Sequence, residues 1–221
     1  MKTVNLLFLL CFTIALASCQ TRNKNSTQEL DSKALLENLN LKRAYFASGC
    51  FWCVEAVYES LNGVTESLSG YSGGHTENPT YEDSNTGTTG HAEAVEIYYD
   101  PEIVSFKSLV DVYFGSQNPL QVDGQGPDNG TQYRSILFYS NETEKQIIAQ
   151  KIEQLNAELA PNKVAAEVMS FKKFWLGEAY HQNYERLNPN QGYIQAVSIP
   201  RLNAFKAKFP ELLKGSHKAR H

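Results

Sequence analysis

A pair of cysteines lies between a predicted strand and a predicted helix, and this junction limits the fold more than any other feature. The pattern over Arg43–Ala47 predicts a short strand. Apolar residues then repeat at helical spacing over Cys50–Leu61. The intervening run, Gly49-Cys50-Phe51-Trp52-Cys53, places Cys50 at a helix amino terminus. Free N–H groups and the helix dipole favour a thiolate there, so we expect Cys50 to be a nucleophile.

The rest of the chain, from about Lys42 to Leu213, mixes strands and helices without regular βαβ alternation. Strands are predicted over residues 64–71, 93–99, 133–139 and 164–169, and helices over residues 105–115, 148–159 and 178–187. Two long polar loops, residues 72–90 and 117–131, separate these elements. We therefore expect one α+β domain in which helices pack against a sheet, and not a doubly wound fold.

The first 41 residues have the pattern of an export signal followed by a polar tether. Lys2 precedes an apolar stretch, Leu6–Leu16, that is shorter than the roughly 20 residues needed to span a bilayer. Leu16-Ala17-Ser18-Cys19 resembles the lipobox of bacterial lipoproteins, which implies cleavage before Cys19 and acylation of that residue. An ordinary signal peptide is the alternative.

Four segments follow from this pattern. We expect a signal peptide over residues 1–18, a tether over residues 19–41, a catalytic domain over residues 42–213 and a basic tail over residues 214–221. The protein would be an exported lipoprotein that faces the periplasm or the cell surface. Gln20 is not the aspartate associated with retention in the inner membrane, which favours the outer membrane.

The count of cysteines supports a redox role for the pair. Of four cysteines, signal cleavage removes Cys11 and lipidation uses Cys19, so Cys50 and Cys53 remain as thiols. A disulfide that closes so short a loop stabilises a fold by only roughly 2 kcal/mol, which weakens a purely structural interpretation. One C-x-x-C supplies two of the four ligands of a zinc site. The formal charge of −4 argues against binding to nucleic acid.

Glu93 is predicted to be a buried acid. Glu93, Val95, Ile97 and Tyr99 share one face of a strand, and this face is otherwise apolar. Desolvation would raise the pKa of Glu93, leaving a proton donor at neutral pH. A frayed strand edge that exposes Glu93 to water is the alternative. Glu96 lies on the opposite face, where we expect it to be solvated.

Two kinds of enzyme remain open at this level. A thioredoxin-like dithiol exchanger also places C-x-x-C after a strand and at a helix start. In the alternative, Cys50 attacks a small polar substrate and Cys53 resolves the oxidised product.

Ordered motifs along the chain favour the second kind. They are Gly49-Cys50-Phe51-Trp52, Gly70-Tyr71-Ser72-Gly73-Gly74, Asn78-Pro79-Thr80-Tyr81, Gly90-His91-Ala92-Glu93-Ala94-Val95, Gly130-Thr131-Gln132-Tyr133-Arg134-Ser135 and Tyr180-His181-Gln182. Together they resemble the peptide-methionine sulfoxide reductases of the A type, over nearly all of the chain from Arg43 to about Tyr193. The resemblance implies a two-layer α+β sandwich of a mixed sheet and helices, with a ferredoxin-like core.

The resemblance also implies reduction of the S epimer of methionine sulfoxide, free or in proteins. By match to the family motifs, Cys50 would attack the sulfoxide sulfur and become a sulfenic acid. Glu93 would protonate the sulfoxide oxygen with help from the hydroxyl groups of Tyr81 and Tyr133, and Asp128 would belong to the same polar network.

The implied substrate-binding residues are Phe51 and Trp52, which would hold the substrate methyl group. Cys53 would condense with the sulfenic acid, and a thioredoxin-like dithiol would reduce the resulting disulfide. No bound cofactor or metal is implied, and we expect a monomer. Gln117-Asn118-Pro119 departs from the His-Asp-Pro common in the family, and we expect an effect on loop packing. A lipoprotein that only binds methionine-rich segments through the same aromatic residues is the non-enzymatic alternative.

The other candidate residues are predicted to be structural. The tyrosines expected in the core or at its rim are Tyr71, Tyr98, Tyr99, Tyr113 and Tyr139. The three histidines His75, His91 and His181 fit no metal-ligand spacing, so we expect loop or packing roles. The basic residues from Arg201 onward are expected to form a solvated end of the chain.

Overall fold

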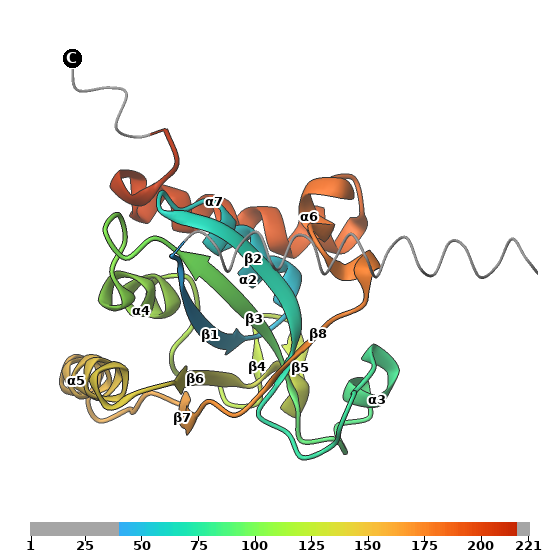
Figure 1. Ribbon diagram of the computed structural model, residues 1–221, viewed down its shortest axis with the longest axis horizontal. Coiled ribbons are helices and arrows are strands. Elements are labelled where there is room, and N and C mark those ends of the chain that lie inside the picture. Colours follow the sequence, from blue (N-terminus) through green and yellow to red (C-terminus); the bar gives the residue numbers. More distant parts are fainter. Residues whose placement is uncertain (1–39, 216–221) are drawn as a thin grey trace, which may run out of the picture. The chain divides into compact units, whose positions relative to one another are not determined.

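A six-stranded mixed sheet lies at the centre of the fold (Figure 1). The computed structural model describes residues 40–215, so the predicted signal peptide, Cys19 and most of the tether and basic tail lie outside the described residues. The strand order is β7-β6-β1-β3-β2-β8, and every neighbouring pair is antiparallel except β6 and β7. The strands are β1 Lys42–Ser48, β2 Val64–Ser72, β3 Ala92–Tyr99, β6 Ser135–Tyr139, β7 Glu167–Ser170 and β8 Phe174–Leu176. A separate two-stranded ribbon pairs β4 Gly124–Gln125 with β5 Asp128–Asn129.

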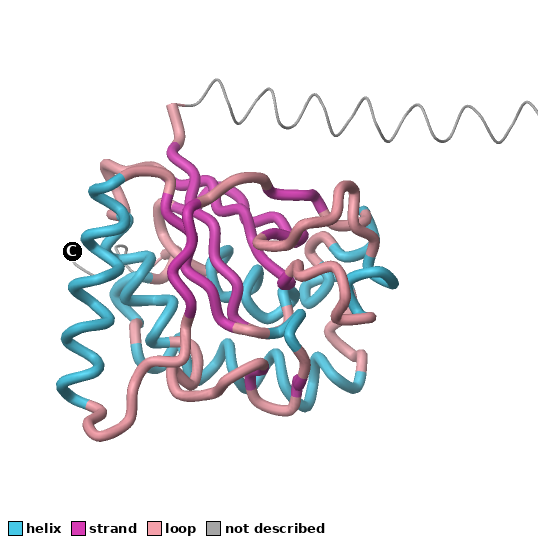
Figure 2. Tube along the Cα trace, turned by 90° about the horizontal axis from the view of Figure 1, so that it is seen from below, coloured by secondary structure: helices cyan, strands magenta, loops and turns pink. Residues whose placement is uncertain are grey.

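Helices pack against this sheet, as Figure 2 shows from a second direction. The helices are α2 Phe51–Glu59, α3 Tyr81–Asn85, α4 Phe106–Gly115, α5 Glu142–Glu158, α6 Tyr184–Leu187 and α7 Ile199–Lys208. Single turns of other helix types occur at Thr131–Tyr133, Ala179–His181, Ile194–Ser198 and Pro210–Leu212. The predicted class, an α+β fold with helices packed on a mixed sheet, is confirmed.

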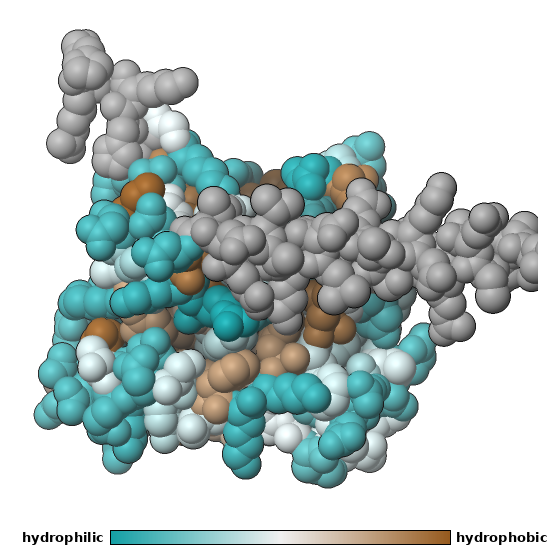
Figure 3. All heavy atoms as spheres, viewed as in Figure 1, coloured by the Kyte–Doolittle hydropathy of each residue, from teal (hydrophilic) through white to brown (hydrophobic). Residues whose placement is uncertain are grey.

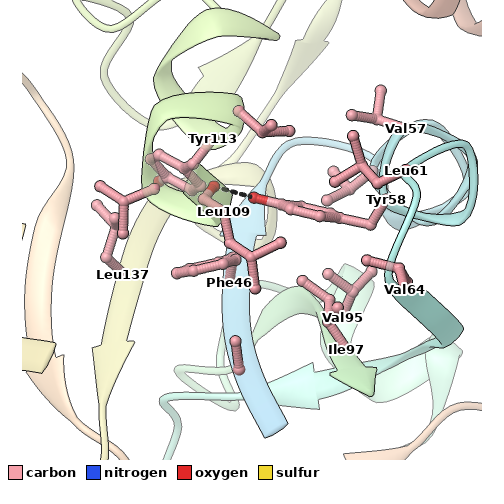
Figure 4. Close-up of a cluster of buried hydrophobic side chains, with 14 of the residues drawn as sticks. Phe46, Val57, Tyr58, Leu61, Val64, Val95, Ile97, Leu109, Tyr113 and Leu137 are labelled. Atoms are coloured by element: carbon pink, nitrogen blue, oxygen red, sulfur yellow. Dashed lines mark hydrogen bonds between the residues drawn. The ribbon is translucent and has the colours of Figure 1, made fainter. Parts of the chain in front are cut away.

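The main core lies between the sheet and the helices. Because side chains alternate along a strand, Ala44 and Phe46 of β1 join this core, while Tyr45 and Ala47 point to the opposite face. Phe46 is fully buried, and its ring lies 5.6 Å from that of Tyr58. Figure 4 shows these rings together, with the hydroxyl of Tyr58 donating to the carbonyl oxygen of Leu109 at 3.1 Å.

The opposite face of the sheet is covered by the short connection between β7 and β8. These strands are the two edges of the sheet, yet only residues 171–173 separate them. A flat sheet would put its edges about 24 Å apart, whereas this connection reaches about 14 Å. The sheet is therefore strongly curled, and Phe171 stacks on Tyr45 of the central strand β1 at 3.6 Å.

Most predicted elements are confirmed, and the differences have identifiable causes. Ser105 caps α4 as predicted, since its hydroxyl accepts from the N–H of Ser108 at 3.0 Å. The predicted loop 72–90 contains the short α3, which a reciprocal cap between Thr80 and Asp83 starts. The predicted strand 133–139 begins two residues later, because Thr131–Tyr133 form a helical turn. Helix α7 was not predicted.

The predicted core tyrosines occupy the interior. Tyr71, Tyr98, Tyr99 and Tyr113 are buried, and Tyr139 packs against the main core. The face in Figure 3 is mainly hydrophilic, with separate apolar side chains at the surface. No helix within residues 40–215 is both long and apolar enough to cross a membrane.

Replacing Phe46 with alanine should lower the free energy of unfolding by about 3–5 kcal/mol, because it opens a cavity where the ring contacts three other aromatic rings. Urea denaturation followed by far-UV circular dichroism measures the change. Ile103→Ala is the matched control, since Ile103 is 56% exposed and should shift the value by less than about 0.5 kcal/mol. Equal effects of the two substitutions would contradict this account of the core.

Candidate active site

Cys50 lies where β1 passes into α2. Gly49 turns the chain with φ of +80°, a conformation that L side chains rarely adopt. A Cβ atom at Gly49 would also lie 2.6 Å from Cβ of Gln125, so the turn requires glycine. The carbonyl oxygen of Cys50 accepts from the N–H of Val54 at 3.3 Å, and Cys50 is the capping residue of α2. The predicted position of Cys50 at the helix amino terminus is confirmed.

The carboxyl group of Glu93 lies at the same helix terminus. Glu93 is the second residue of β3, and it is 2% exposed. Its Oε2 accepts a hydrogen bond from the backbone N–H of Phe51 at 2.9 Å. Burial raises the pKa of Glu93 to about 8, and the hydrogen bond from Phe51 offsets only part of that rise. The predicted inward orientation is confirmed, and the carboxyl group is mainly protonated at neutral pH.

Three further predicted polar groups lie in the same region. Tyr81 begins α3, Tyr133 ends the turn Thr131–Tyr133, and Asp128 begins β5. Burial raises the pKa of each of these groups. For both tyrosines the nearby Glu93, Cys50 and Asp128 raise the pKa further. The structure therefore brings together the five side chains that the sequence motifs indicated, from separate elements of the fold.

An aromatic cluster surrounds the predicted substrate-binding residues. The ring of Phe51 lies 4.8 Å from that of His181 and 6.4 Å from that of Tyr81. Trp52 stacks on Tyr184 at 3.8 Å, and its Nε1 donates to Nδ1 of His181 at 3.1 Å. Burial lowers the pKa of His181, which keeps the ring neutral and its Nδ1 free to accept. These contacts hold Trp52 in one orientation and create an aromatic surface suited to a thioether methyl group.

The two thiols of Cys50 and Cys53 have different electrostatic surroundings. Both cysteines are reduced and buried. Burial raises the pKa of Cys50 well above its ordinary value, and the hydrogen bond with Cys53 adds to the shift. The hydrogen bond from Cys50 and the charge of Arg201 lower the pKa of Cys53 to about 6. Burial of Cys50 thus opposes the stabilisation of a thiolate by the helix terminus, and its role as the nucleophile stays a prediction.

Tyr193 and Arg201 belong to the site, although the sequence analysis missed both. The hydroxyl of Tyr193 lies 3.7 Å from Sγ of Cys53 and donates to Oδ2 of Asp128 at 2.6 Å. Arg201 donates to the carbonyl oxygens of Ser48 and Ser116, at 3.0 and 2.8 Å. It is thus not part of a solvated end, which corrects that expectation. No local pattern marks either residue, since both reach Cys53 from a distant segment of the chain.

Glu55 is a second buried carboxyl group that the sequence analysis did not identify. It lies on α2 and accepts hydrogen bonds from the hydroxyl of Ser69 and the N–H of Asn183. Burial raises the pKa of Glu55 to about 8. Because Asn183 follows His181 closely, Glu55 attaches the segment that carries His181 to the helix that carries Trp52.

Glu96 is buried, and the prediction that it is solvated is wrong. It is 5% exposed, accepts from the hydroxyl of Tyr45 at 2.9 Å and pairs with Arg43 at 3.5 Å. The two-residue period of side chains along a strand correctly placed Glu96 on the face of β3 opposite to Glu93. The connection that carries Phe171 covers this face, and nothing in the local pattern of β3 revealed that cover.

The run Gln117-Asn118-Pro119, which differs from the His-Asp-Pro common in the family, takes part in loop packing. Gln117 accepts from the hydroxyl of Ser135 at 3.0 Å, and Asn118 exchanges two hydrogen bonds with the side chain of Gln125. His91 has the predicted loop role: its Nδ1 accepts from the N–H of Gly74 at 3.1 Å. Within residues 40–215, no group of three His, Cys, Asp or Glu side chains is arranged to hold a metal.

Comparisons with known proteins identify the family. A family model described as peptide methionine sulfoxide reductase matches residues 42–213. The chain is 43% identical to the peptide methionine sulfoxide reductase MsrA of Pasteurella multocida over 173 residues, which cover 78% of this chain and 99% of the relative. It is 45% identical to MsrA 2 of Mesorhizobium japonicum over 171 residues, covering 76% and 88%.

Solved structures agree with the sequence relatives. The reduced form of Mxr1 from Saccharomyces cerevisiae is similar with a TM-score of 0.64 and 31% identity, covering 68% of this chain and 87% of that one. Methionine sulfoxide reductase A of Corynebacterium diphtheriae gives a TM-score of 0.62 and 31% identity, covering 69% and 77%. Because the family model spans most of the chain and the curated relatives match over nearly their whole length, the chain belongs to the peptide methionine sulfoxide reductase family.

Proposed function

We propose that this protein reduces the S epimer of methionine sulfoxide, free or in proteins, to methionine. The observation that supports this most is the buried carboxyl group of Glu93, which lies at the same helix terminus as Cys50. Reduction of a sulfoxide needs a nucleophile at sulfur and a proton for the departing oxygen. A dithiol exchanger has no need for the second group, so this pairing favours sulfoxide chemistry.

In the first step the sulfur of Cys50 attacks the sulfoxide sulfur. The thiol of Cys50 becomes acidic as its sulfur bonds to the substrate, and the hydrogen-bonded thiolate of Cys53 can accept its proton. Glu93 protonates the sulfoxide oxygen. Its Oε2 is occupied by the N–H of Phe51, which leaves Oε1 to carry the proton. The protonated oxygen then leaves the substrate sulfur and bonds to Sγ of Cys50, while the bond between the two sulfurs breaks. Methionine takes the electron pair of that bond, and Cys50 is left as a sulfenic acid.

Tyr81, Tyr133 and Asp128 support this step through hydrogen bonding. The pKa of both tyrosines is raised by burial and by nearby Glu93, so their hydroxyl groups stay protonated and can donate to the developing oxyanion. Phe51 and Trp52 hold the thioether methyl group against the aromatic cluster.

Cys53 then regenerates the nucleophile. Its sulfur attacks Sγ of the Cys50 sulfenic acid, and water leaves as the Cys50–Cys53 disulfide forms. The nearby charge of Arg201 favours the reactive thiolate form of Cys53. A thioredoxin-like dithiol outside the protein then supplies two electrons, and no bound cofactor takes part.

The same proposal places the enzyme at a membrane, where it repairs oxidised exported proteins. Support comes from the lipobox-like run ending at Cys19, from the polar tether and from Gln20, which favours the outer membrane. The catalytic unit acts as a monomer.

Replacing Glu93 with glutamine should lower the rate of sulfoxide reduction by about 10²–10⁴-fold, because the amide cannot deliver a proton. The wild-type rate should fall as pH rises through about 8, where Glu93 loses its proton, and the variant should lose this dependence. Single-turnover kinetics across pH measures both effects. Glu96→Gln is the matched control, since Glu96 is an equally buried carboxyl group on the other face of β3. A dependence on pH that survives in Glu93→Gln would exclude Glu93 as the donor.

Replacing Cys53 with serine should permit about one turnover and then stop. Intact-mass analysis after one equivalent of methionine S-sulfoxide should show a gain of about 16 Da in the variant and a loss of about 2 Da in the wild type. Cys50→Ser is the control and should show neither change. Sustained turnover of Cys53→Ser with a thioredoxin-type donor would rule out the resolving role of Cys53.

Replacing Cys19 with alanine should release the enzyme from the membrane, because acylation needs the thiol. Fractionation of cells and metabolic labelling with a fatty acid measure the two consequences. Cys11→Ala is the control and should leave both readouts unchanged. Retention of label in Cys19→Ala would show that the anchor lies elsewhere.

A further inference from the structure

Glu178 is an ionised carboxylate beside the sulfoxide site, and the proposed reaction does not use it. It follows β8 closely and precedes the turn Ala179–His181. Its Oε1 accepts from the backbone N–H of Tyr81 at 2.8 Å, and its Oε2 accepts from the hydroxyl of Tyr71 at 2.8 Å. Burial would raise the pKa of Glu178, but these hydrogen bonds and one from its own N–H hold the pKa below its ordinary value. Glu178 is therefore charged at neutral pH, whereas Glu93 is mainly protonated.

The ring of His181 links this carboxylate to Trp52. The indole Nε1 of Trp52 can only donate, so Nδ1 of His181 is the acceptor in their 3.1 Å hydrogen bond. Because burial lowers the pKa of His181, the ring is neutral and its single proton lies on Nε2. Within residues 40–215, this buried Nε2 has no hydrogen-bond partner, and Oε2 of Glu178 lies 3.9 Å from it. The charge of Glu178 stabilises a proton at Nε2 and so favours the tautomer that accepts from Trp52.

The placement of Tyr81 depends on the same carboxylate. Tyr81 is the first residue of α3, so its backbone N–H has no partner inside that helix, and Glu178 supplies one from a distant part of the chain. The ring of Tyr81 lies 4.6 Å from that of His181. Loss of the carboxylate would therefore release the start of α3 and displace the hydroxyl group that supports protonation of the sulfoxide oxygen.

We propose that Glu178 is a positioning residue that orients two parts of the sulfoxide site with one carboxylate. Through the Nε2 proton of His181 it fixes the ring of Trp52, which holds the substrate methyl group. Through the N–H of Tyr81 it places the hydroxyl group that donates to the sulfoxide oxygen. Glu178 itself does not touch the substrate. This inference rests on the proposed reduction of methionine sulfoxide.

Other contacts hold the segment around Glu178, so its carboxylate can be replaced without releasing the chain. The side-chain amide of Gln182 binds both the N–H and the carbonyl oxygen of Ser69, and Glu55 accepts from the N–H of Asn183. The side chain of Glu178 is partly exposed. Replacement by glutamine therefore keeps the fold and removes the charge.

Single-turnover reduction of methionine S-sulfoxide across substrate concentrations separates binding from the chemical step. Glu178→Gln should raise the half-saturating concentration about fivefold as Trp52 loosens, and lower the maximum rate about tenfold as Tyr81 shifts. Glu82→Gln is the matched control, since the charge of Glu82 also reaches His181 while the hydrogen bonds of Glu178 remain. It should change each value by less than about twofold. Equal effects of the two substitutions would overturn the proposal.

Two further measurements test the route through His181. In a His181→Asn background, Glu178→Gln should leave the half-saturating concentration unchanged, because the link to Trp52 is already broken. The chain has two tryptophans, Trp52 and Trp175, so proton NMR resolves their indole N–H groups. Glu178→Gln should speed the exchange of the Trp52 indole N–H with D2O about fivefold. The indole N–H of Trp175 is the internal control and should exchange as in the wild type.

The NMR measurement needs no turnover, which separates this proposal from the proposed function. Tyr71→Phe removes one of the two hydrogen bonds that orient the carboxylate of Glu178, and it should speed exchange at Trp52 in the same direction. Unchanged exchange at Trp52 in Glu178→Gln, or independent effects of Glu178→Gln and His181→Asn on the half-saturating concentration, would overturn the proposal. Absence of sulfoxide reduction by the wild type would instead contradict the proposed function.

Discussion

The hydrogen bond from the N–H of Phe51 to Oε2 of Glu93 is the interaction on which the site depends. It joins the first turn of α2 to the start of β3, so the nucleophile and the acid cannot move apart without breaking it. The bond satisfies an N–H group that the helix leaves free, and it orients a carboxyl group that would otherwise be buried without a partner. This one hydrogen bond thus caps the start of α2, orients the carboxyl group of Glu93 and keeps Cys50 close to it.

Burial sets the protonation of the whole site. Glu93 and both site tyrosines have raised pKa values because water is excluded, so each keeps a proton that it can donate. The same burial disfavours charge on Cys50, and the charge of the thiol pair moves toward Cys53 and Arg201. The attacking sulfur and the resolving sulfur therefore differ in environment, although only two residues separate them.

The carboxyl-terminal third of the chain completes the surroundings of Trp52 and Cys53. His181 and Tyr184 hold Trp52, while Glu55 fastens their segment to α2. Further along, Tyr193 reaches Cys53 and Asp128, and Arg201 binds the ends of β1 and α4 through Ser48 and Ser116. A nucleophile supplied by the first strand–helix unit is thus enclosed by residues far away in the sequence.

The sequence by itself determined the strand–turn–helix junction, the position of Cys50 and the inward orientation of Glu93. These features follow from local periodicity and from the backbone freedom of Gly49, and they need no long-range information. Ordered motifs added Tyr81, Tyr133 and Asp128 through resemblance. Only the tertiary structure decided that Glu96 is covered by the segment carrying Phe171, that Arg201 lies beside the thiol pair, and that Cys53 has the lower pKa. Desolvation and charge proximity depend on which distant segments pack together, and the strand or helix period of a single segment does not contain that information.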